Sequence, residues 1–186
     1  MTVLLLHSVF GLRPAVRAAA DRIRATGHEV VVPDLFDGRT TGDVEEGRRI
    51  KDEIGTEELT RRAAAAAEPY ERLVYAGFSL GAGLAHDLAF ADDGARGLLL
   101  MHGTSDVPEE AKAGFPVQLH VADPDRFEPA DWLAEWSEGM RRCGARAEIF
   151  RYPGAGHVFT GPGLTDHDEP AADAAWTRAL AFVQGL

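Results

Sequence analysis

The chain has 186 residues, of which 45% are hydrophobic, and its formal net charge is −11 at pH 7. This length suits one domain with a sizeable core, and we expect a single domain over residues 1–186. The acidic balance argues against nucleic acid or an anionic membrane as a partner. Cys143 is the only cysteine, which excludes a disulfide framework and favours a reducing compartment.

The chain begins with a short apolar run, residues 3–6, that is typical of a strand buried on both faces. No basic region precedes this run and no A-x-A-like cleavage site follows it, so it does not resemble a signal peptide. Nothing approaches the length of a membrane span. We therefore expect a soluble cytoplasmic protein, as a monomer or a homodimer.

Strands and helices are expected to alternate along the chain. This alternation predicts an α/β fold with a mostly parallel sheet of about six strands and helices on both faces. In such folds, ligands collect at the carboxyl ends of the strands. Short apolar runs predict strands at residues 3–6, 28–32, 73–78, 97–101, 117–121 and 147–152. Helical spacing predicts helices from about Pro14 to Gly27, over 44–53, from Thr56 as N-cap through 67, over 80–91 and 130–142, and after about 168.

The centre of the sequence holds the motif Gly77-Phe78-Ser79-Leu80-Gly81, between an apolar run and a small-residue helical pattern. This is the Gly-x-Ser-x-Gly nucleophile elbow, in which a serine sits on a sharp turn from strand to helix. The turn lifts the Ser79 hydroxyl above the sheet. It also places the Leu80 N–H at a helix N-terminus, where it can donate to an oxyanion. The alternative is an ordinary tight turn between a strand and a helix.

A base and an acid follow the serine in the order expected for an α/β-hydrolase triad. His157 lies in a glycine-rich turn after the sixth expected strand, and histidine titrates near neutral pH, as a base for a serine must. Asp123 and Asp125 follow the fifth expected strand, where a carboxylate can hold the imidazole in the required tautomer. Either aspartate can be this acid, while the other caps the Pro-containing turn.

An oxyanion hole needs a second backbone donor, which in this fold comes from the loop after the first strand. We expect this donor to be the N–H of Val9, although Val9 can equally be an apolar wall of the pocket. Residues 36–58 lie close to the expected pocket and are a candidate wall or lid. For His7 and Ser8, capping of the loop is an equal alternative to substrate contact. The candidate pocket residues are His7, Ser8, Phe10, Phe36, His102 and Phe159.

Other polar clusters have simpler explanations than a ligand site. Residues 166–168, Asp-His-Asp, resemble a metal-ligand cluster, but no second histidine has a suitable spacing, so we expect acidic residues at the start of a helix. Asp34 and Asp37 are explained by Asx turns. Arg48, Arg49 and Lys51 fit a solvated helix face better than the alternative, a site for a substrate carboxylate. Cys143 has no base near it in the sequence, and we give it no nucleophilic role.

Five segments spread over nearly the whole chain carry a resemblance to a known family: residues 9–11, 27–36, 77–83, 125–129 and 152–159. In these segments the chain resembles the dienelactone hydrolase family, a small branch of the α/β hydrolases. In the family pattern the acid lies two residues before an aromatic or aliphatic residue and four before a proline. That register selects Asp125 over Asp123, because Phe127 and Pro129 follow at those positions.

The chain departs from the family pattern at three positions. Dienelactone enzymes use a cysteine at the elbow, where this chain has Ser79. They carry a glutamate where this chain has Ser8, and a substrate-binding arginine where it has Gly161. The resemblance therefore implies the fold and machinery for acyl transfer, but not dienelactone as the substrate. It favours a serine-dependent esterase or lactonase for an uncharged substrate.

The sequence thus predicts a serine hydrolase that cleaves a small ester, lactone or thioester through Ser79, His157 and Asp125, with no metal or organic cofactor. One alternative is a flavodoxin-like or Rossmann-type binding protein. It would need a phosphate-cradling loop after the first strand, where residues 7–11 hold only one glycine. Another alternative is an inactive hydrolase-fold protein that serves as an interaction module, although all three triad residue types are present.

Overall fold

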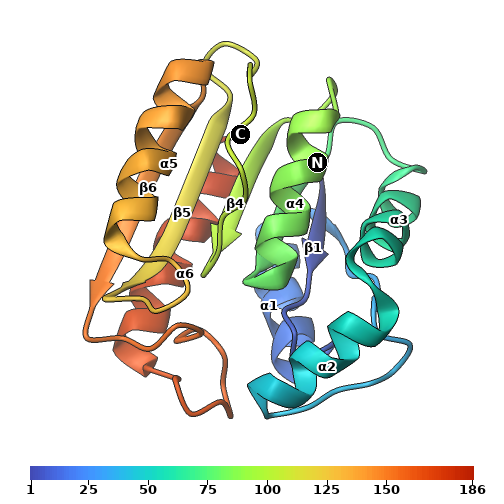
Figure 1. The fold of residues 1–186 in the computed structure, drawn as a ribbon. Coiled ribbons are helices and arrows are strands. Elements are labelled where there is room, and N and C mark those ends of the chain that lie inside the picture. Colours follow the sequence, from blue (N-terminus) through green and yellow to red (C-terminus); the bar gives the residue numbers. More distant parts are fainter.

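The structure is a computed structural model that describes residues 1–186. Its centre is one sheet of six parallel strands in the order β2-β1-β3-β4-β5-β6, which confirms the expected parallel sheet (Figure 1). All six expected strands are present, with β2 shorter and β5 longer than expected. The strands are β1 (Thr2–Leu6), β2 (Glu29–Val31), β3 (Val74–Phe78), β4 (Gly97–Met101), β5 (Pro116–Asp123) and β6 (Arg146–Pro153).

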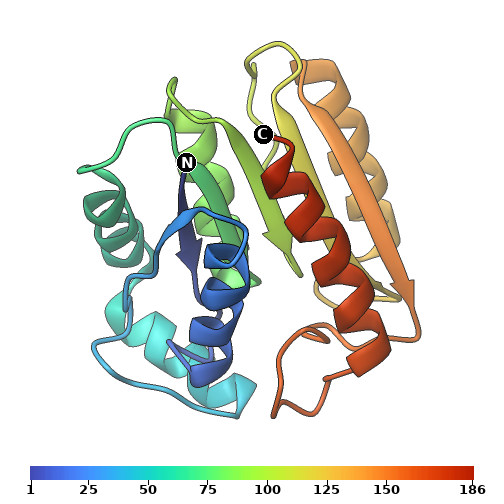
Figure 2. The ribbon, with the colours of Figure 1, turned by 180° about the vertical axis from the view of Figure 1, so that it is seen from behind.

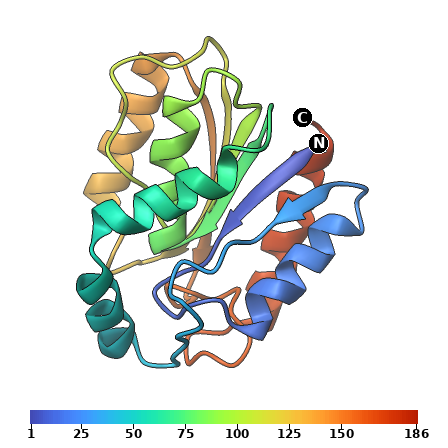
Figure 3. The same cartoon turned by 90° about the vertical axis from the view of Figure 1, so that its right-hand side faces the viewer.

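Six helices flank the sheet, and they are α1 (Pro14–Arg24), α2 (Val44–Ile54), α3 (Thr56–Ala67), α4 (Leu80–Ala91), α5 (Ala130–Cys143) and α6 (Glu169–Gln184). α3, α4 and α5 cover the face seen in Figure 1, whereas α1 and α6 cover the face seen in Figure 2. Figure 3 shows these two helical layers from the side. α2 lies near the carboxyl ends of the strands. None of the helices has the length and apolar character needed to cross a bilayer.

Two hydrophobic clusters fill the spaces between the sheet and its helices. In β1, Leu4 and Leu6 belong to the cluster under α3, α4 and α5, while Val3 and Leu5 belong to the cluster under α1 and α6. The alternation arises because successive side chains of a strand point to opposite faces. Since both faces are covered, the strand is a continuous apolar run, and each fully buried leucine contributes about 2 kcal/mol.

Side-chain caps explain where two of the helices begin. Asp43 accepts a hydrogen bond from the N–H of Glu46 at the start of α2, and Asp168 accepts one from Ala171 at the start of α6. The expectation of a helix start near Asp168 is therefore confirmed. The expectation that Thr56 caps α3 is wrong. Gly55, with φ 87°, ends α2 and precedes α3 directly, so Thr56 is already the first helical residue.

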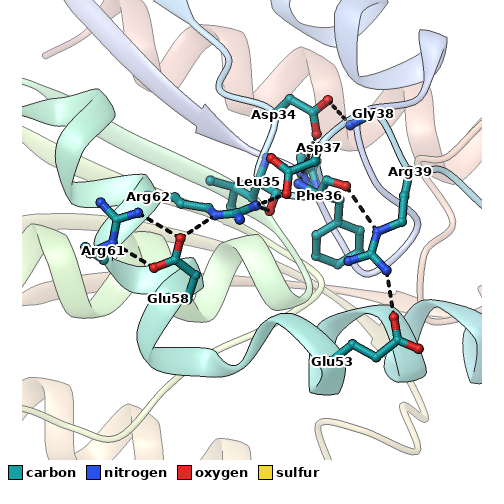
Figure 4. A network of polar contacts seen from close by, with 11 residues as sticks. Asp34, Leu35, Phe36, Asp37, Gly38, Arg39, Glu53, Glu58, Arg61 and Arg62 are labelled. Atoms are coloured by element: carbon teal, nitrogen blue, oxygen red, sulfur yellow. Dashed lines mark hydrogen bonds and ion pairs between the residues drawn. The ribbon is translucent and has the colours of Figure 1, made fainter.

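The turn after β2 is stabilised by the carboxylate of Asp34 (Figure 4). The side chain of Asp34 accepts hydrogen bonds from the N–H groups of Phe36 at 3.0 Å and Gly38 at 2.7 Å. This is the Asx-type turn expected for Asp34. Asp37 departs from that expectation, because its carboxylate accepts a hydrogen bond from Arg62 of α3 at 2.8 Å instead.

Two arginines fasten this turn to α2 and α3 (Figure 4). Arg62 donates to the carbonyl of Leu35 and to the carboxylate of Glu58, each at 2.8 Å. Arg39 forms an ion pair with Glu53 of α2 at 2.7 Å. Surface ion pairs of this kind each contribute at most about 1 kcal/mol. Together they link the turn to both helices, and so they favour one position of α2 near the carboxyl ends of the strands.

Candidate active site

Ser79 lies between β3 and α4 in a backbone conformation that non-glycine residues rarely adopt. Its φ is 49° and its ψ is −111°. Strained conformations of this kind cost about 1–3 kcal/mol and cluster at functional sites. The N–H of Ser79 donates to the carbonyl of Met101 in β4 at 2.8 Å, which joins the turn to the neighbouring strand. This is the sharp strand-to-helix turn that the Gly-x-Ser-x-Gly motif predicts.

Close backbone approaches require glycine around this turn. A Cβ atom on Gly77 would collide with the carbonyl of Gly81, and one on Gly81 would collide with the carbonyl of Leu6. A Cβ atom on Gly103, in the loop after β4, would lie 2.8 Å from the carbonyl oxygen of Ser79. The serine turn is therefore packed against backbone on several sides, and its position is closely determined.

The three side chains expected to form a triad lie within hydrogen-bond distance of one another. Ser79 Oγ is 2.9 Å from Nε2 of His157. On the other side of the ring, Nδ1 of His157 is 2.7 Å from Oδ2 of Asp125. A carboxylate can only accept, so Nδ1 carries the proton of the neutral ring and Nε2 is free to accept the hydroxyl proton of the serine.

Of the two candidate acids, Asp125 is the one in contact with His157. Its Oδ1 also accepts hydrogen bonds from the N–H groups of Phe127 at 2.9 Å and Glu128 at 3.4 Å. Burial acts to raise the pKa of Asp125, but the bonds from His157 and these N–H groups outweigh it and hold the pKa below its usual value. Asp123 ends β5, and its side chain makes no hydrogen bond to the histidine.

The loop that carries His157 is closed by an acidic residue further along the chain. Asp166 packs directly on Gly156, where a Cβ atom would lie 2.6 Å from the Cβ of the aspartate. The carboxylate of Asp166 also accepts a hydrogen bond from the N–H of Val158 at 3.4 Å. His167 bonds to the carbonyl of Phe159 at 2.9 Å. These contacts account for the Asp-His-Asp sequence as loop and helix-start structure.

A cleft of about 610 Å³ opens at the carboxyl ends of the strands, and Ser79 and His157 lie in its wall. Val9 and Leu80, the two expected oxyanion donors, also line it. The hydrogen bonds of the turns and loops include none donated by the N–H of either residue. From α2 the cleft is lined by Val44, Arg48 and Lys51, so residues 36–58 do form part of its wall.

α2 is packed tightly against the loop that holds Val9. A Cβ atom on Gly47 of α2 would collide with the carbonyl oxygen of Val9. The N–H of Thr41, just before the helix, donates to the carbonyl of Phe10 at 3.1 Å. The position of α2 and the position of the backbone around Val9 therefore depend on each other.

His102 and Phe10 line the cleft, as expected. The ring of His102 is buried, with Nε2 2.6 Å from Oγ1 of Thr160 and Nδ1 without a partner. Burial lowers the pKa of His102 to well below its usual value, and the nearby His157 acts in the same direction. The ring is therefore neutral near pH 7, and it lies edge-on to the ring of His157, with 6.2 Å between the centroids.

His7 and Phe36 do not line the cleft, so the expectation that they are pocket residues is wrong. Both are fully buried and pack edge to face at 4.9 Å. Nε2 of His7 accepts a hydrogen bond from the N–H of Leu35 at 3.0 Å, and Nδ1 lies 2.8 Å from the carbonyl of Ser8. The imidazole thus joins the loop after β1 to the turn after β2, and the loop alternative is the better one for His7.

Ser8 and Phe159 also lie outside the cleft wall. The Ser8 hydroxyl accepts a hydrogen bond from the N–H of Phe10 at 3.3 Å, which is the loop-capping alternative. Phe159 is fully buried and packs against His102. Ser8 and Gly161, two positions where the chain departs from the dienelactone pattern, border an adjoining cavity of about 330 Å³ near α1 and α6, which shares Phe10 and His102 with the cleft.

Several residues of the cleft were not expected from the sequence. Phe127 packs on the ring of His157, with 4.5 Å between the centroids. The guanidinium groups of Arg48 and Arg126 lie 5.3 Å and 4.6 Å from the centre of the Phe127 ring. Arg48 thus contacts the site instead of forming only a solvated face. Its helical spacing from Val44 was an available signal, because residues four apart share a helix face.

The parallel sheet, the serine on its sharp turn and the cleft at the carboxyl ends of the strands are the features of the α/β-hydrolase fold. The model of the dienelactone hydrolase family matches residues 1–186, and the chain belongs to that family. It is thus a carboxylic-ester hydrolase, and the resemblance read from the five sequence segments is confirmed.

Relatives of known sequence or structure are similar to this chain over most of its length. A carboxymethylenebutenolidase of Rhodococcus opacus is 26% identical, over 98% of this chain and 80% of the relative. A dienelactone hydrolase of Anabaena variabilis has a similar fold, with a TM-score of 0.69, 19% identity and coverage of 99% and 85% of the two chains. A dienelactone hydrolase-like promiscuous phosphotriesterase from metagenomic libraries also has a similar fold. Its TM-score is 0.80 and its sequence identity 18%, over 98% of this chain and 85% of the other.

Proposed function

We propose that the protein hydrolyses a small ester, lactone or thioester through a Ser-His-Asp triad and an acyl-enzyme intermediate. Ser79 is the nucleophile, His157 the general base and Asp125 the acid that orients the base. The observation that carries this proposal is the unbroken chain of contacts, 2.9 Å from Ser79 to His157 and 2.7 Å from His157 to Asp125.

In the first half of the reaction, Ser79 Oγ attacks the carbonyl carbon while its proton passes to Nε2 of His157. The imidazolium that forms is stabilised by the ionised Asp125. The negative charge on the carbonyl oxygen is stabilised by the N–H groups of Val9 and Leu80, at about 3 kcal/mol for each donor. The imidazolium then gives its proton to the departing alcohol or thiol, and the acyl group remains on the serine.

In the second half, the same groups act on water. His157, again neutral, takes a proton from a water molecule, which attacks the acyl carbon. The two N–H groups stabilise the second tetrahedral oxyanion. The proton on His157 returns to Ser79 Oγ as the acid product leaves. Every proton is accounted for by these residues and water, so the proposed reaction requires no cofactor.

The substrate class is proposed on chemical grounds. Ser79 stands where dienelactone enzymes have cysteine, and the position of their substrate-binding arginine is Gly161, which lies outside the cleft wall. The relative in Rhodococcus opacus is a carboxymethylenebutenolidase, which supports an ester or lactone as the substrate class here. The cleft of about 610 Å³ suits a ligand of small to moderate size.

Labelling with a fluorophosphonate tests the proposal, because this reagent forms a covalent bond with an activated serine. Wild-type protein should label, and Ser79→Ala should not. Ser105→Ala is the matched control, since Ser105 also lines the cleft, and it should label like wild type. Wild-type protein that fails to label, or Ser79→Ala that labels equally, would refute the proposal and favour a non-catalytic hydrolase-fold binding protein.

A further inference from the structure

A second carboxylate, Glu128, is buried in the wall of the cleft and has no part in the reaction described above. Its exposed fraction is only 8%. It follows Asp125 by three positions and precedes α5. Burying a carboxylate is costly unless its oxygens are hydrogen-bonded. The partners of this side chain therefore indicate what it does.

Both carboxylate oxygens of Glu128 accept hydrogen bonds from one residue, Thr104. Oε1 accepts from the Thr104 N–H at 3.0 Å, and Oε2 accepts from the Thr104 hydroxyl at 2.7 Å. Burial raises the pKa of Glu128, while the hydrogen bonds from Thr104 act to lower it. Trp132 in the first turn of α5 donates from Nε1 to the same hydroxyl oxygen at 2.8 Å. Thr104 is thus held by two side chains from the region after β5.

Thr104 belongs to the loop that supports the serine turn. Its neighbour Gly103 packs so closely on Ser79 that a Cβ atom there would lie 3.1 Å from the Cα of the serine. The carbonyl of Thr104 lies 3.4 Å from the position of a Cβ atom on Gly83, in the first turn of α4. On the other side, the N–H of Glu128 donates to Oδ1 of Asp125 at 3.4 Å.

We propose that Glu128 is a positioning residue that joins the loop supporting Ser79 to the loop carrying Asp125, with Thr104 as its partner. The backbone of Glu128 contacts Asp125. Its side chain is hydrogen-bonded to the loop that packs on Ser79. This tie fixes the separation that His157 has to span. The inference rests on the proposed function, because it assigns Glu128 a role in aligning that triad.

Two substitutions distinguish the effect of the hydrogen bonds between Glu128 and Thr104 from the effect of the carboxylate charge. In Glu128→Gln, the amide oxygen can accept from the Thr104 N–H, and the amide NH₂ can donate to the Thr104 hydroxyl oxygen, so the tie is kept. Glu128→Ala removes it. Because a shift of about 1 Å at a triad can cost about 100-fold in rate, Glu128→Ala should lower kcat 10- to 100-fold. The KM should change less than about 3-fold, since both carboxylate oxygens of Glu128 are bonded to Thr104 and are not free to bind substrate.

The experiment measures kcat and KM for p-nitrophenyl acetate, the rate of fluorophosphonate labelling and the thermal midpoint. We expect Glu128→Gln and Thr104→Ser to stay within about 5-fold of the wild-type kcat. Glu128→Ala and Thr104→Val should both lose activity, and the double variant should lose less than the product of the two single losses. Glu135→Ala, an exposed glutamate on α5, is the matched control and should behave as wild type.

The outcomes distinguish this inference from the proposed function. If wild-type protein does not label, the proposed function fails. If wild type labels and Glu128→Ala labels and turns over at the wild-type rate, the tie has no role and only this inference fails. It also fails if Glu128→Gln is as inactive as Glu128→Ala, or if the two single losses multiply in the double variant. Should Glu128→Ala not fold, Thr104→Val and Glu128→Gln decide the matter.

Discussion

At the scale of single residues, the choice between two aspartates depends on a spacing of only two positions. Asp125 Oδ2 lies 2.7 Å from Nδ1 of His157, whereas the side chain of Asp123 makes no such bond. Reasoning from residue types alone allowed either aspartate to be the acid. The family pattern, in which the acid lies four residues before a proline, selected Asp125. In the structure, the backbone N–H groups of Phe127 and Glu128 turn back onto the Asp125 carboxylate and hold it.

Asp125→Asn should lower kcat by about 10³- to 10⁴-fold, because an amide favours the wrong tautomer of the imidazole and cannot stabilise the imidazolium. Asp123→Asn should stay within a few-fold of wild type. Steady-state hydrolysis of p-nitrophenyl acetate by the two variants, made side by side, provides the comparison. Equal losses in both variants, or a larger loss in Asp123→Asn, would contradict the assignment of the acid.

At the scale of elements, α2 is placed by its contact with the loop after β1. Gly47 has no room for a Cβ atom, because the carbonyl of Val9 occupies that space. In an exposed helix, Gly→Ala would stabilise the protein by up to about 1 kcal/mol. At Gly47 the added methyl group must displace either α2 or the backbone of Val9, and the proposed oxyanion donor would move with it.

Gly47→Ala should therefore lower kcat by about 10- to 100-fold while the protein remains folded. Gly42→Ala is a suitable control, because a Cβ atom at Gly42 meets nothing within 4 Å and the residue borders the same cleft. Kinetics with p-nitrophenyl acetate and far-UV circular dichroism would be recorded for both variants. Wild-type kcat in Gly47→Ala would mean that the position of α2 does not affect the oxyanion site.

The helices and strands could be predicted from local patterns, whereas several side-chain positions could not. The buried run at residues 3–6 and the elbow motif are local signals, and the structure reproduces both. His7 and Phe36 were misplaced because their partners lie far along the chain. His7 is held by the N–H of Leu35, 28 positions away, which no spacing rule predicts. Glu128 and Thr104 were missed for the same reason, since 24 positions separate them.

At the scale of the whole molecule, buried histidines link stability to pH. His120 is fully buried in β5, with Nδ1 2.8 Å from the Tyr152 hydroxyl and Nε2 2.9 Å from Oε1 of Gln118. Burial lowers the pKa of His120 to about 3, with a smaller effect of Arg178 in the same direction. The unfolded chain binds this proton near pH 6.5, so between pH 6.5 and 3 it holds more protons than the folded chain.

Stability should therefore fall as the pH is lowered through this window. His120 alone should reduce the free energy of unfolding by about 2 kcal/mol between pH 7 and pH 5. Urea unfolding at a series of pH values would measure this slope. His120→Gln, whatever its own stability, should show a shallower slope over the same range. An unchanged slope in that variant would show that His120 is not the group responsible.

The central claim, that Ser79 carries the acyl group, is tested most directly by trapping the intermediate. Wild-type protein would be mixed with p-nitrophenyl acetate, quenched in acid during turnover, digested and examined by mass spectrometry. We predict one acetyl group on the peptide that contains Ser79, and none on that peptide in Ser79→Ala. Turnover with this peptide unmodified, or with the acetyl group on another residue, would contradict the account.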